Sequence, residues 1–343
     1  MQNKRTIFII AGLLLLAGLA IISLQFGAYK FQGNLWDVLV EVVIGKPASN
    51  PTDSYVFFSI RLPRIVMSIL VGSALAVSGT ALQGMFKNPL ATPNLIGVTA
   101  GASLFAAITI VLGSYLKSFI PDALHFFLLS IMAFLGAIIT MIFVYRISTT
   151  KRKTNVVIML LAGVAITALS GAITGFLTYL TDEEELRDLI FWTLGSLGGS
   201  SWLKVGILAV VILLAYSLLL NKGKALNAMM LGEQDATHLG VPVEKIKKQI
   251  IVLTALLVGT CVAFTGTIGF VGLIIPYILR LIFSSNYYII LPLSAIGGGV
   301  LLLIADTLSR VIVAPTEMPI GVLTAFLGTP IFIAILIRHK KLL

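Results

Sequence analysis

Residues 71–81, VGSALAVSGTA, decide the fold because residues 258–268, VGTCVAFTGTI, repeat them. Five of the eleven positions are identical, and two more exchange Ser for Thr. Both segments lie in long apolar runs, so the chain is expected to contain two related halves. If five membrane crossings separate the copies, the halves run in opposite directions. An inverted repeat of this kind is typical of transporters.

The composition indicates that lipid is the solvent of this chain. Of its 343 residues, 58% are hydrophobic and only 11% are charged, and the mean hydropathy is +1.05. No polar stretch is long enough for a separate water-soluble unit, so we expect one integral membrane domain over residues 1–343. The first apolar run, residues 7–24, has no clear small-residue cleavage site and is expected to be a retained helix.

About 20 apolar residues are needed for each crossing, which predicts an all-α membrane protein with about ten transmembrane helices. They are placed at residues 7–27, 62–83, 93–112, 123–146, 155–180, 202–220, 246–266, 269–283, 288–308 and 320–338. With the N-terminus inside, 16 basic and 3 acidic residues fall on the cytoplasmic side, as the positive-inside rule requires. We therefore expect a multi-pass protein of the cytoplasmic membrane, inner or sole, with both termini in the cytoplasm. This topology explains the net charge of +10 without nucleic-acid binding.

The longest polar stretch on the predicted cytoplasmic face is residues 221–248. Its apolar residues have roughly helical spacing, while Gly232 and Gly240 separate two short helices and Pro242 ends the second. Such a pair could lie on lipid headgroups as an amphipathic connector. Glu233 and Asp235 disfavour anionic lipid, however, and favour a groove on a partner protein.

Six motifs occur along the chain in one order: residues 61–102 (RLPRIVMSILVGSALAVSGTALQGMFKNPLATPNLIGVTAGA), 159–166 (MLLAGVAI), 231–241 (LGEQDATHLGV), 266–282 (GTIGFVGLIIPYILRLI), 305–310 (ADTLSR) and 318–336 (MPIGVLTAFLGTPIFIAIL). Together they resemble the FecCD/BtuC-like permease family of type II ABC importers, which take up iron chelates, haem and cobalamin. The resemblance extends over residues 55–338. It implies ten helices per subunit, a second permease subunit (an identical or a related copy), a cytoplasmic ABC ATPase dimer and an extracytoplasmic substrate-binding protein.

The resemblance assigns the contact with the ATPase to residues 231–240. The residues expected there are Leu231, Gly232, Glu233, Asp235, Ala236, Leu239 and Gly240. Glu233 and Asp235 would be charge partners, and Leu239 would pack into the partner. No G-x-x-x-x-G-K-[ST] string occurs in the sequence, so ATP hydrolysis is expected in the partner and the chain itself is expected not to be an enzyme.

Three arginines near the predicted outer face are a second candidate site. Arg61 and Arg64 flank Pro63 at a helix start, where a cation opposes both the helix dipole and the charge bias of the topology. Interfacial snorkelling is one explanation. The resemblance implies another, that Arg61, Arg64 and Arg310 receive acidic residues of the binding protein. Asp306, four residues before Arg310, is expected to form a structural ion pair with it.

The acidic run at residues 181–188 is expected to be an external loop, and the apolar residues that follow resemble the family's short external helix beside the pathway exit. Gly195, Ser196, Gly198 and Gly199 are expected to shape a gate there. Pro276, inside an apolar span, marks a second place where moving parts are expected. No G-x-S-x-G string surrounds the serines, which argues against a serine hydrolase.

One cysteine and three scattered histidines do not suggest a metal site, and no cofactor is expected. Iron, if carried, would arrive inside a chelator. A ferric siderophore is favoured because most relatives carry one, while citrate chelates, haem and cobalamin stay open. The alternative function is an ion-coupled secondary carrier acting without an ATPase. Such a carrier would be expected to place more acidic residues or histidines inside its spans.

Overall fold

The structure, a computed structural model, describes residues 2–33, 38, 40, 50–283 and 285–340. Every regular element in that part of the chain is helical except one short hairpin. The elements are α1 (Gln2–Gln25), α3 (Pro51–Tyr55), a π-helical turn (Val56–Arg61), α4 (Leu62–Phe86), a 3-10 turn (Pro93–Ile96), α5 (Val98–Val111), α6 (Gly113–Ser118), α7 (Asp122–His125), α8 (Leu128–Ser148), β1 (Thr149–Thr150), β2 (Lys153–Thr154), α9 (Val156–Leu180), α10 (Glu183–Leu194), α11 (Trp202–Leu220), α12 (Gly223–Leu231), α13 (Glu233–His238), α14 (Val243–Thr265), α15 (Val271–Phe283), α16 (Tyr287–Ser309) and α17 (Ile320–Lys340).

Each of the ten predicted crossings coincides with an apolar helix. Among the described residues, seven helices are long and apolar enough to cross a membrane: α1, the continuous helix Pro51–Phe86, α8, α9, α11, α14 and α16. Three shorter apolar helices, α5, α15 and α17, fall on the remaining predicted crossings. The expectation of an all-α membrane protein is therefore confirmed for the described residues.

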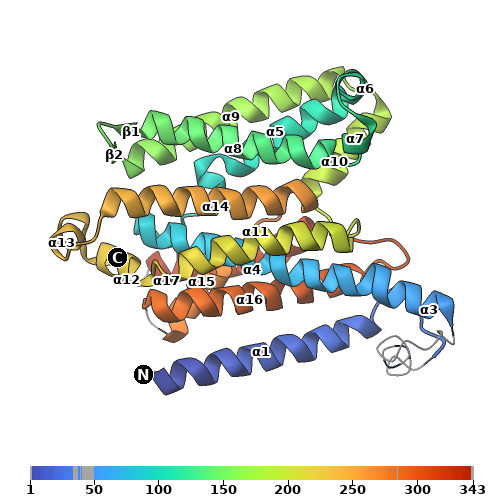
Figure 1. Cartoon of the computed structure of the whole chain (residues 1–343), viewed down its shortest axis with the longest axis horizontal. Coiled ribbons are helices and arrows are strands. Elements are labelled where there is room, and N and C mark those ends of the chain that lie inside the picture. Colours follow the sequence, from blue (N-terminus) through green and yellow to red (C-terminus); the bar gives the residue numbers. More distant parts are fainter. Residues whose placement is uncertain (1, 34–37, 39, 41–49, 284, 341–343) are drawn as a thin grey trace.

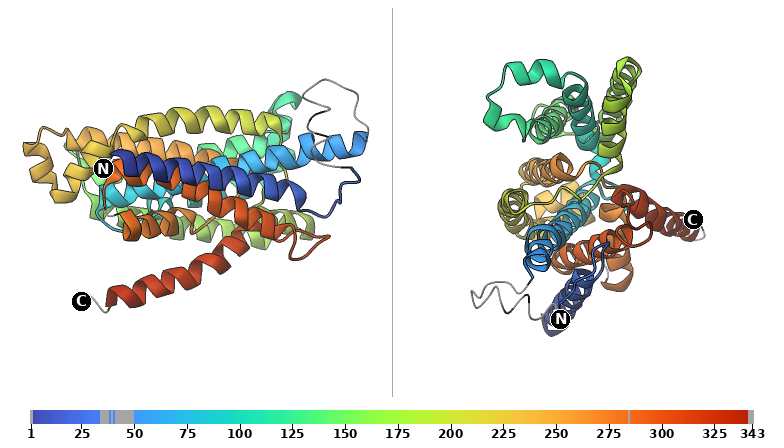
Figure 2. Two further views of the ribbon diagram at one scale, coloured as in Figure 1. Left: turned by 90° about the horizontal axis from the view of Figure 1, so that it is seen from below. Right: turned by 90° about the vertical axis from the view of Figure 1, so that its right-hand side faces the viewer.

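Helix α4 lies at the centre of the molecule, in contact with α1, α11, α14, α15 and α16. Helices α5, α8 and α9 form a second layer beyond α14 (Figure 1). The long helices lie roughly along one axis, some running one way and some the other, so the molecule has two ends. One end carries both termini, α12, α13 and the β1–β2 hairpin, and the other carries α3, α6 and α7 (Figures 1 and 2). We call them the α13 end and the α3 end.

The two copies of the sequence repeat lie on α4 and α14, which run in opposite directions (Figure 1). Their neighbours correspond as well. Helix α4 packs on α15 and α16, whereas α14 packs on α5 and α8, the helices at the same positions in the other half. The inverted repeat predicted from eleven residues thus describes the packing of α4, α15 and α16 and of their counterparts α14, α5 and α8.

Equivalent glycines of the repeat occupy equivalent helix contacts. A methyl group on Gly72 of α4 would lie 2.2 Å from the carbonyl oxygen of Gly298 on α16. At the matching position of α14, a methyl group on Gly259 would lie 3.1 Å from the Cβ atom of Ala137 on α8. Small residues let helix backbones approach closely, which provides dispersion contacts where lipid removes the hydrophobic drive.

Pro276 lies inside α15, which continues through it as a helix. A proline has no N–H, so the carbonyl of Gly272, four residues earlier, loses its usual partner. The side chain of Gln83 on α4 donates its Nε2–H to that carbonyl at 3.1 Å, and Arg280 in turn donates to Oε1 of Gln83. The close approach of α4 at Gly79 makes this bond possible. Protein groups rather than water therefore satisfy the freed carbonyl, as membrane depth requires.

The second crossing begins earlier than predicted, at Pro51 instead of residue 62. The residues before Pro63 form a π-helical turn, in which the N–H of Leu62 bonds to the carbonyl of Phe57, five residues back. Pro63 cannot donate the next backbone hydrogen bond. The π-helical turn therefore lets the helix continue across residue 62, where the sequence predicted that it begins.

We predict that Gly79→Ala lowers the free energy of unfolding by about 3 kcal/mol, the upper range for overpacking a core. The added methyl group would lie 1.9 Å from the carbonyl oxygen of Gly272, so α4 and α15 must separate along their contact. Denaturant titration of the protein in detergent micelles measures the change. Gly206→Ala on α11, where a methyl group meets nothing within 4 Å, is the matched control. Equal stability of the two variants would contradict the prediction.

Candidate functional site

Three buried charged side chains form an ion cluster at the α3 end of α4 and α16. The Nε atom of Arg64 lies 2.8 Å from Oδ1 of Asp306, and the Nε atom of Arg310 lies 3.2 Å from Oδ2 of the same carboxylate. Asp306 is fully buried, and both arginines are less than a tenth exposed. The predicted ion pair between Asp306 and Arg310 is confirmed. Asp306 also forms an ion pair with Arg64, which lies on the neighbouring helix α4. One carboxylate thus ties α4 to α16.

The outer hydrogens of the two arginines have further partners in the chain. Arg64 donates through Nη1 to both carboxylate oxygens of Glu317, at 2.7 and 2.9 Å. Arg310 donates through Nη2 to Oγ of Ser23 at 2.7 Å and through Nη1 to the carbonyl of Phe26 at 3.1 Å. Arg310 therefore fixes the end of α1, and Arg64 fixes the segment that precedes α17.

Arg61 is buried beside this cluster, with a relative exposure of 3%. It donates to the carbonyl oxygens of Leu24 and Tyr29, and its guanidinium carbon lies 4.4 Å from the ring centroid of Phe31. All three arginines predicted for docking are thus placed together and engaged by their own chain. An acidic residue of a partner would have to compete with these contacts. The docking role of Arg61, Arg64 and Arg310 stays a prediction.

A small cavity of about 260 Å³ adjoins the cluster. Arg64 and Glu317 line it on one side, and Gly195, Ser196 and Leu197 line it on another. The side chain of Glu317 is 46% exposed, which makes it the accessible edge of the ion cluster. Glu317 was not among the residues predicted from sequence, although an acidic residue in the charge-poor segment before Ile320 is a signal of such a role.

The predicted gate glycines lie where three segments meet through their backbones. Gly195, with φ +74°, ends α10, and its carbonyl accepts the N–H of Ile320 at the start of α17, at 3.1 Å. The N–H of Ser196 bonds to the carbonyl of Thr265 at 2.8 Å. A side chain at position 195 would collide with the carbonyl of Thr267, which lies 2.5 Å from the site of its first carbon. The junction of α10, α14 and α17 therefore requires a glycine there.

Gly198 and Gly199 lie beyond this junction, in the turn before α11. The N–H of Gly198 donates a hydrogen bond to Oγ of Ser196 at 3.0 Å. The ammonium group of Lys204 donates a hydrogen bond to the carbonyl oxygen of Gly199 at 2.8 Å. Pro276 lies elsewhere, at the contact between α4 and α15. The four predicted gate residues thus lie in and next to one junction, and Pro276, the second place where movement was predicted, is separate from it.

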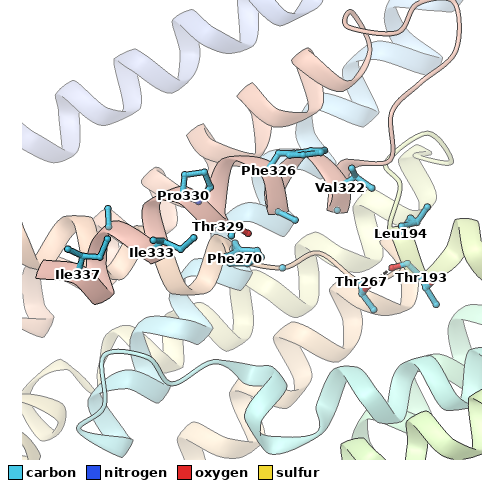
Figure 3. A pocket seen from close by; sticks show the side chains of 14 residues that line it. Thr193, Leu194, Thr267, Phe270, Val322, Phe326, Thr329, Pro330, Ile333 and Ile337 are labelled. Atoms are coloured by element: carbon cyan, nitrogen blue, oxygen red, sulfur yellow. Dashed lines mark hydrogen bonds between the residues drawn. The ribbon is translucent and has the colours of Figure 1, made fainter. Parts of the chain in front are cut away.

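A large apolar groove runs along α17 from this junction. Its volume is about 930 Å³, and Figure 3 shows side chains of α17 facing it along the length of the helix. It is lined by Thr193, Leu194, Thr267, Gly269, Phe270, Gly321, Val322, Ala325, Phe326, Thr329, Pro330, Ile333, Ala334 and Ile337. None of these carries a charge. The groove can hold a large molecule without an ion pair that would retain it.

Phe270 of the groove has a backbone φ of +65°, which is uncommon for an aromatic residue. Its ring carbons pack on Gly328 of α17, where a methyl group would lie 2.4 Å from Cγ of Phe270. Strained backbone of this kind clusters at functional sites. Local spacing does not predict Phe270 as a site residue, because its contact with Gly328 joins segments far apart in the chain.

Helix α17 itself is loosely attached. Its far half diverges from the other helices (Figure 2), and Phe326, Ile333 and Ile337 are each about half exposed or more. Its start is held by Gly195 through Ile320. The helix that contributes most of the groove is therefore anchored at its start, while its far half diverges from the other helices.

The predicted contact segment at the α13 end consists of α12 and α13, as expected for two short helices. Gly232 and Gly240, with φ of +146° and +81°, form the two turns. The side chains of Leu231 and Leu239 are 68% and 64% exposed, whereas Ala236 is fully buried in the core of the protein. Leu231 and Leu239 therefore present apolar surface to solvent, while Ala236 holds α13 in place.

The acidic residues of this segment differ in their surroundings. Asp235 is exposed, but Oε2 of Glu233 lies 2.7 Å from the ammonium of Lys247 on α14. Glu233 thus already has a charge partner within the chain. Lys247 was not predicted as a site residue. Residues 245–248 contain three lysines, and their spacing does not reveal that Lys247 is buried while Lys245 and Lys248 are exposed.

No group of three His, Cys, Asp or Glu side chains that could hold a metal ion occurs among the described residues. The ionic groups at the α3 end pair carboxylates with arginines. They provide positioning and electrostatic contacts.

Comparison with known proteins places these features in a family. Residues 13–338 match the model of the FecCD transport family. The chain is 38% identical to the hemin transport system permease protein HmuU of Yersinia pestis, over 96% of this chain and 95% of that protein. It is 40% identical to the vitamin B12 import system permease protein BtuC of Vibrio vulnificus, over 81% of this chain and 82% of that protein.

Solved structures agree with this result. The chain superposes on a metal-chelate type ABC transporter in an inward-facing conformation with a TM-score of 0.83 and 32% identity, covering 96% of this chain and 98% of the other. A second match, PsaBC from Streptococcus pneumoniae in complex with Fab, has a TM-score of 0.54 and 17% identity over 82% of this chain and 93% of the other, and it shows likeness of fold alone.

We predict that Asp306→Asn destabilises the protein by about 3–5 kcal/mol, the range for removing one partner of a buried ion pair. Arg64 and Arg310 would then be left facing each other without the carboxylate that both contact. Glu317→Gln, at a half-exposed position, is expected to cost less than about 1 kcal/mol. Thermal and denaturant unfolding in detergent measure both variants, and a larger loss for Glu317→Gln would contradict the prediction.

Proposed function

The chain belongs to the FecCD transport family and is an ABC importer permease, and we propose that its cargo is a ferric siderophore complex. The groove along α17 carries this proposal. Its uncharged, largely apolar lining suits a bulky organic chelate more than a bare hydrated ion. Transit also requires that binding be weak enough to allow release, which uncharged walls favour.

The family leaves several cargoes open within this class. The matched permeases are named for hemin and vitamin B12, and the matched structure is described as a metal-chelate type transporter. These ligands share a metal held inside a large organic shell. Within that class we propose a siderophore complex as the cargo. The uptake experiment described below distinguishes it from haem and cobalamin.

We place the α13 end in the cytoplasm. Both termini lie at that end together with α12 and α13 (Figures 1 and 2), and the basic residues of the loops concentrate there. The whole chain then forms one integral domain whose segment 221–248 faces the cytoplasm. The exposed Leu231 and Leu239 of that segment would pack into a groove of an ABC ATPase, with Asp235 as a charge partner.

A second permease subunit would complete the pathway. The groove is open along α17, and the apolar side chains of that helix stand away from the rest of the chain. A second copy, or a related chain, set against α17 would convert two grooves into one enclosed passage. The junction at Gly195, Ser196, Gly198 and Gly199 would then lie at its extracytoplasmic mouth and shape the gate.

The α3 end would receive the substrate-binding protein. Arg61, Arg64 and Arg310 gather there in one cluster, and Glu317 is its accessible edge. A carboxylate of the binding protein would approach this edge and compete with Glu317 for Arg64. Docking would thereby act on the segment that leads into α17.

Uptake into proteoliposomes tests the proposed function. With the ATPase and binding-protein partners present, we predict uptake that requires ATP and continues when ion gradients are collapsed. Radiolabelled ferric catecholate and hydroxamate siderophores, ferric citrate, haem and cobalamin form the panel of cargoes. Preferential uptake of haem or cobalamin would overturn the siderophore proposal. Uptake by this chain alone under a proton gradient would instead establish a secondary carrier.

We predict that Leu239→Asp uncouples ATP hydrolysis from transport, because a charged side chain cannot enter an apolar groove without losing its hydration. Uptake per ATP hydrolysed should fall at least about tenfold, within the usual range of coupling between sites. Binding of the binding protein at the opposite end should be unchanged. Leu239→Met, which keeps the apolar side chain, is the matched control, and normal uptake by Leu239→Asp would refute the role of Leu239.

A further inference from the structure

Lys247 is a buried cation at the α13 end. It lies on the first turns of α14 with a relative exposure of 1%, while Lys245 and Lys248 on the same helix are exposed. A buried ammonium group is costly unless each of its three hydrogens has an acceptor. All three are used here, and the three acceptors belong to three different segments of the chain.

The first two acceptors are carboxylates. Oε2 of Glu233, the first residue of α13, lies 2.7 Å from Nζ of Lys247. Oε1 of Glu244, one helical turn before Lys247 on α14, lies 3.1 Å away. Lys247 therefore fixes the start of α13 to α14 by an ion pair in addition to the apolar contact of Ala236.

The third acceptor belongs to the other half of the molecule. The carbonyl oxygen of Thr154, at the end of the β1–β2 hairpin, accepts from Lys247 at 3.1 Å. The N–H of the same residue bonds to Oε2 of Glu244 at 2.8 Å. Thr154 is held at both of its backbone groups, and the next residue, Asn155, caps the start of α9.

The hairpin is the direct connection between α8 and α9. Thr149 pairs with Thr154 in an antiparallel register, so the two residues join the end of α8 to the start of α9. Figure 1 shows the hairpin, α13 and the start of α14 at the same end of the molecule. A displacement of α13 would therefore reach α8 and α9 through Lys247 without passing through the membrane core.

Helix α12 has an equivalent attachment to the second half. Asn227 donates to Oδ1 of Asn286 at 3.0 Å and accepts the N–H of Tyr287 at 2.8 Å, at the start of α16. The segment proposed to contact the ATPase is thus fastened to both halves of the repeat. Asn227 fastens it to the second half, and Lys247 fastens it to the first.

We propose that Lys247 is a positioning residue that couples α13 to the hairpin at the start of α9, so that both halves of the repeat follow the movement of the contact segment. The inference rests on the proposed function, since it concerns how force from the ATPase enters this chain. It assigns Glu233 to the internal link instead of to the partner surface. A discrete polar link between elements is the kind of contact through which such coupling is carried.

Distance measurement tests the link in the purified chain, before any partner is added. Spin labels are placed at two exposed positions, Lys153→Cys on the hairpin and Thr237→Cys on α13, while the buried native Cys261 stays unlabelled. The unmodified link should give one narrow distance distribution. Lys247→Met should broaden it about twofold, because the hairpin and α13 then move independently. An unchanged distribution in Lys247→Met would overturn the inference, whatever the cargo or the partners prove to be.

Transport supplies the second readout in the reconstituted complex. Lys247→Met should lower uptake per ATP hydrolysed about tenfold, within the usual range of coupling between sites, while ATP hydrolysis stays within about twofold. Lys247→Arg should restore most of the uptake, and Lys248→Met, at the exposed neighbouring position, should match the unmodified chain. Normal uptake per ATP in Lys247→Met would overturn the inference while leaving the permease assignment intact. Absence of ATP-dependent uptake in the unmodified complex would overturn the proposed function and leave the distance test standing.

Glu244→Gln keeps the inference falsifiable if Lys247→Met fails to fold. The substitution weakens the hydrogen bond from the N–H of Thr154 to residue 244 but leaves the ion pair of Lys247 with Glu233 in place. The variant should broaden the same distance distribution to an intermediate width. A distribution as narrow as that of the unmodified chain would count against the link.

Discussion

A polar group carried into lipid is costly unless it finds a partner within the protein, and this constraint shapes the contacts that α4 makes with α15 and α16. Asp306 is shared by Arg64 and Arg310, so one carboxylate joins α4 to α16. The carbonyl freed by Pro276 is satisfied by Gln83 from α4. Each solution requires two helices at short range. The small residues at the helix contacts therefore have a second purpose besides packing, since they bring backbone and side-chain groups within hydrogen-bonding distance.

The two halves of the inverted repeat share the packing of their core helices but differ in the position of their last helix. Helices α4 and α14 hold equivalent central positions, and Gly72 and Gly259 occupy equivalent contacts. The halves differ where function is proposed. Helix α9 packs on α5 and α8, whereas its counterpart α17 diverges from the bundle and lines the groove. Symmetry of the core thus coexists with a difference in the terminal helix of each half.

The sequence predicted the elements and the pairing of the halves, because hydropathy and a short repeat both report on helix length and packing. It also predicted the pair of Asp306 with Arg310, which lie one turn apart on the same helix. Partners from distant segments were beyond its reach. Arg64 contacts Glu317 across 253 positions, and Lys247 contacts Thr154 across 93. Local spacing carries no information on such contacts, so the sequence did not distinguish the buried Lys247 from the exposed Lys245 and Lys248.

The distribution of strong and weak contacts indicates where the molecule can change shape. Ion pairs and backbone contacts between glycines fix α4, α15 and α16 to one another, and separating them would expose charges to lipid. The start of α17 is held near Gly195, and among its described residues the far half diverges from the other helices. Elements with few buried contacts move at low cost. A shift of α17 would change the width of the groove while the ion cluster and the α4 contacts stay intact, so a rigid core and a mobile pathway can coexist in one chain.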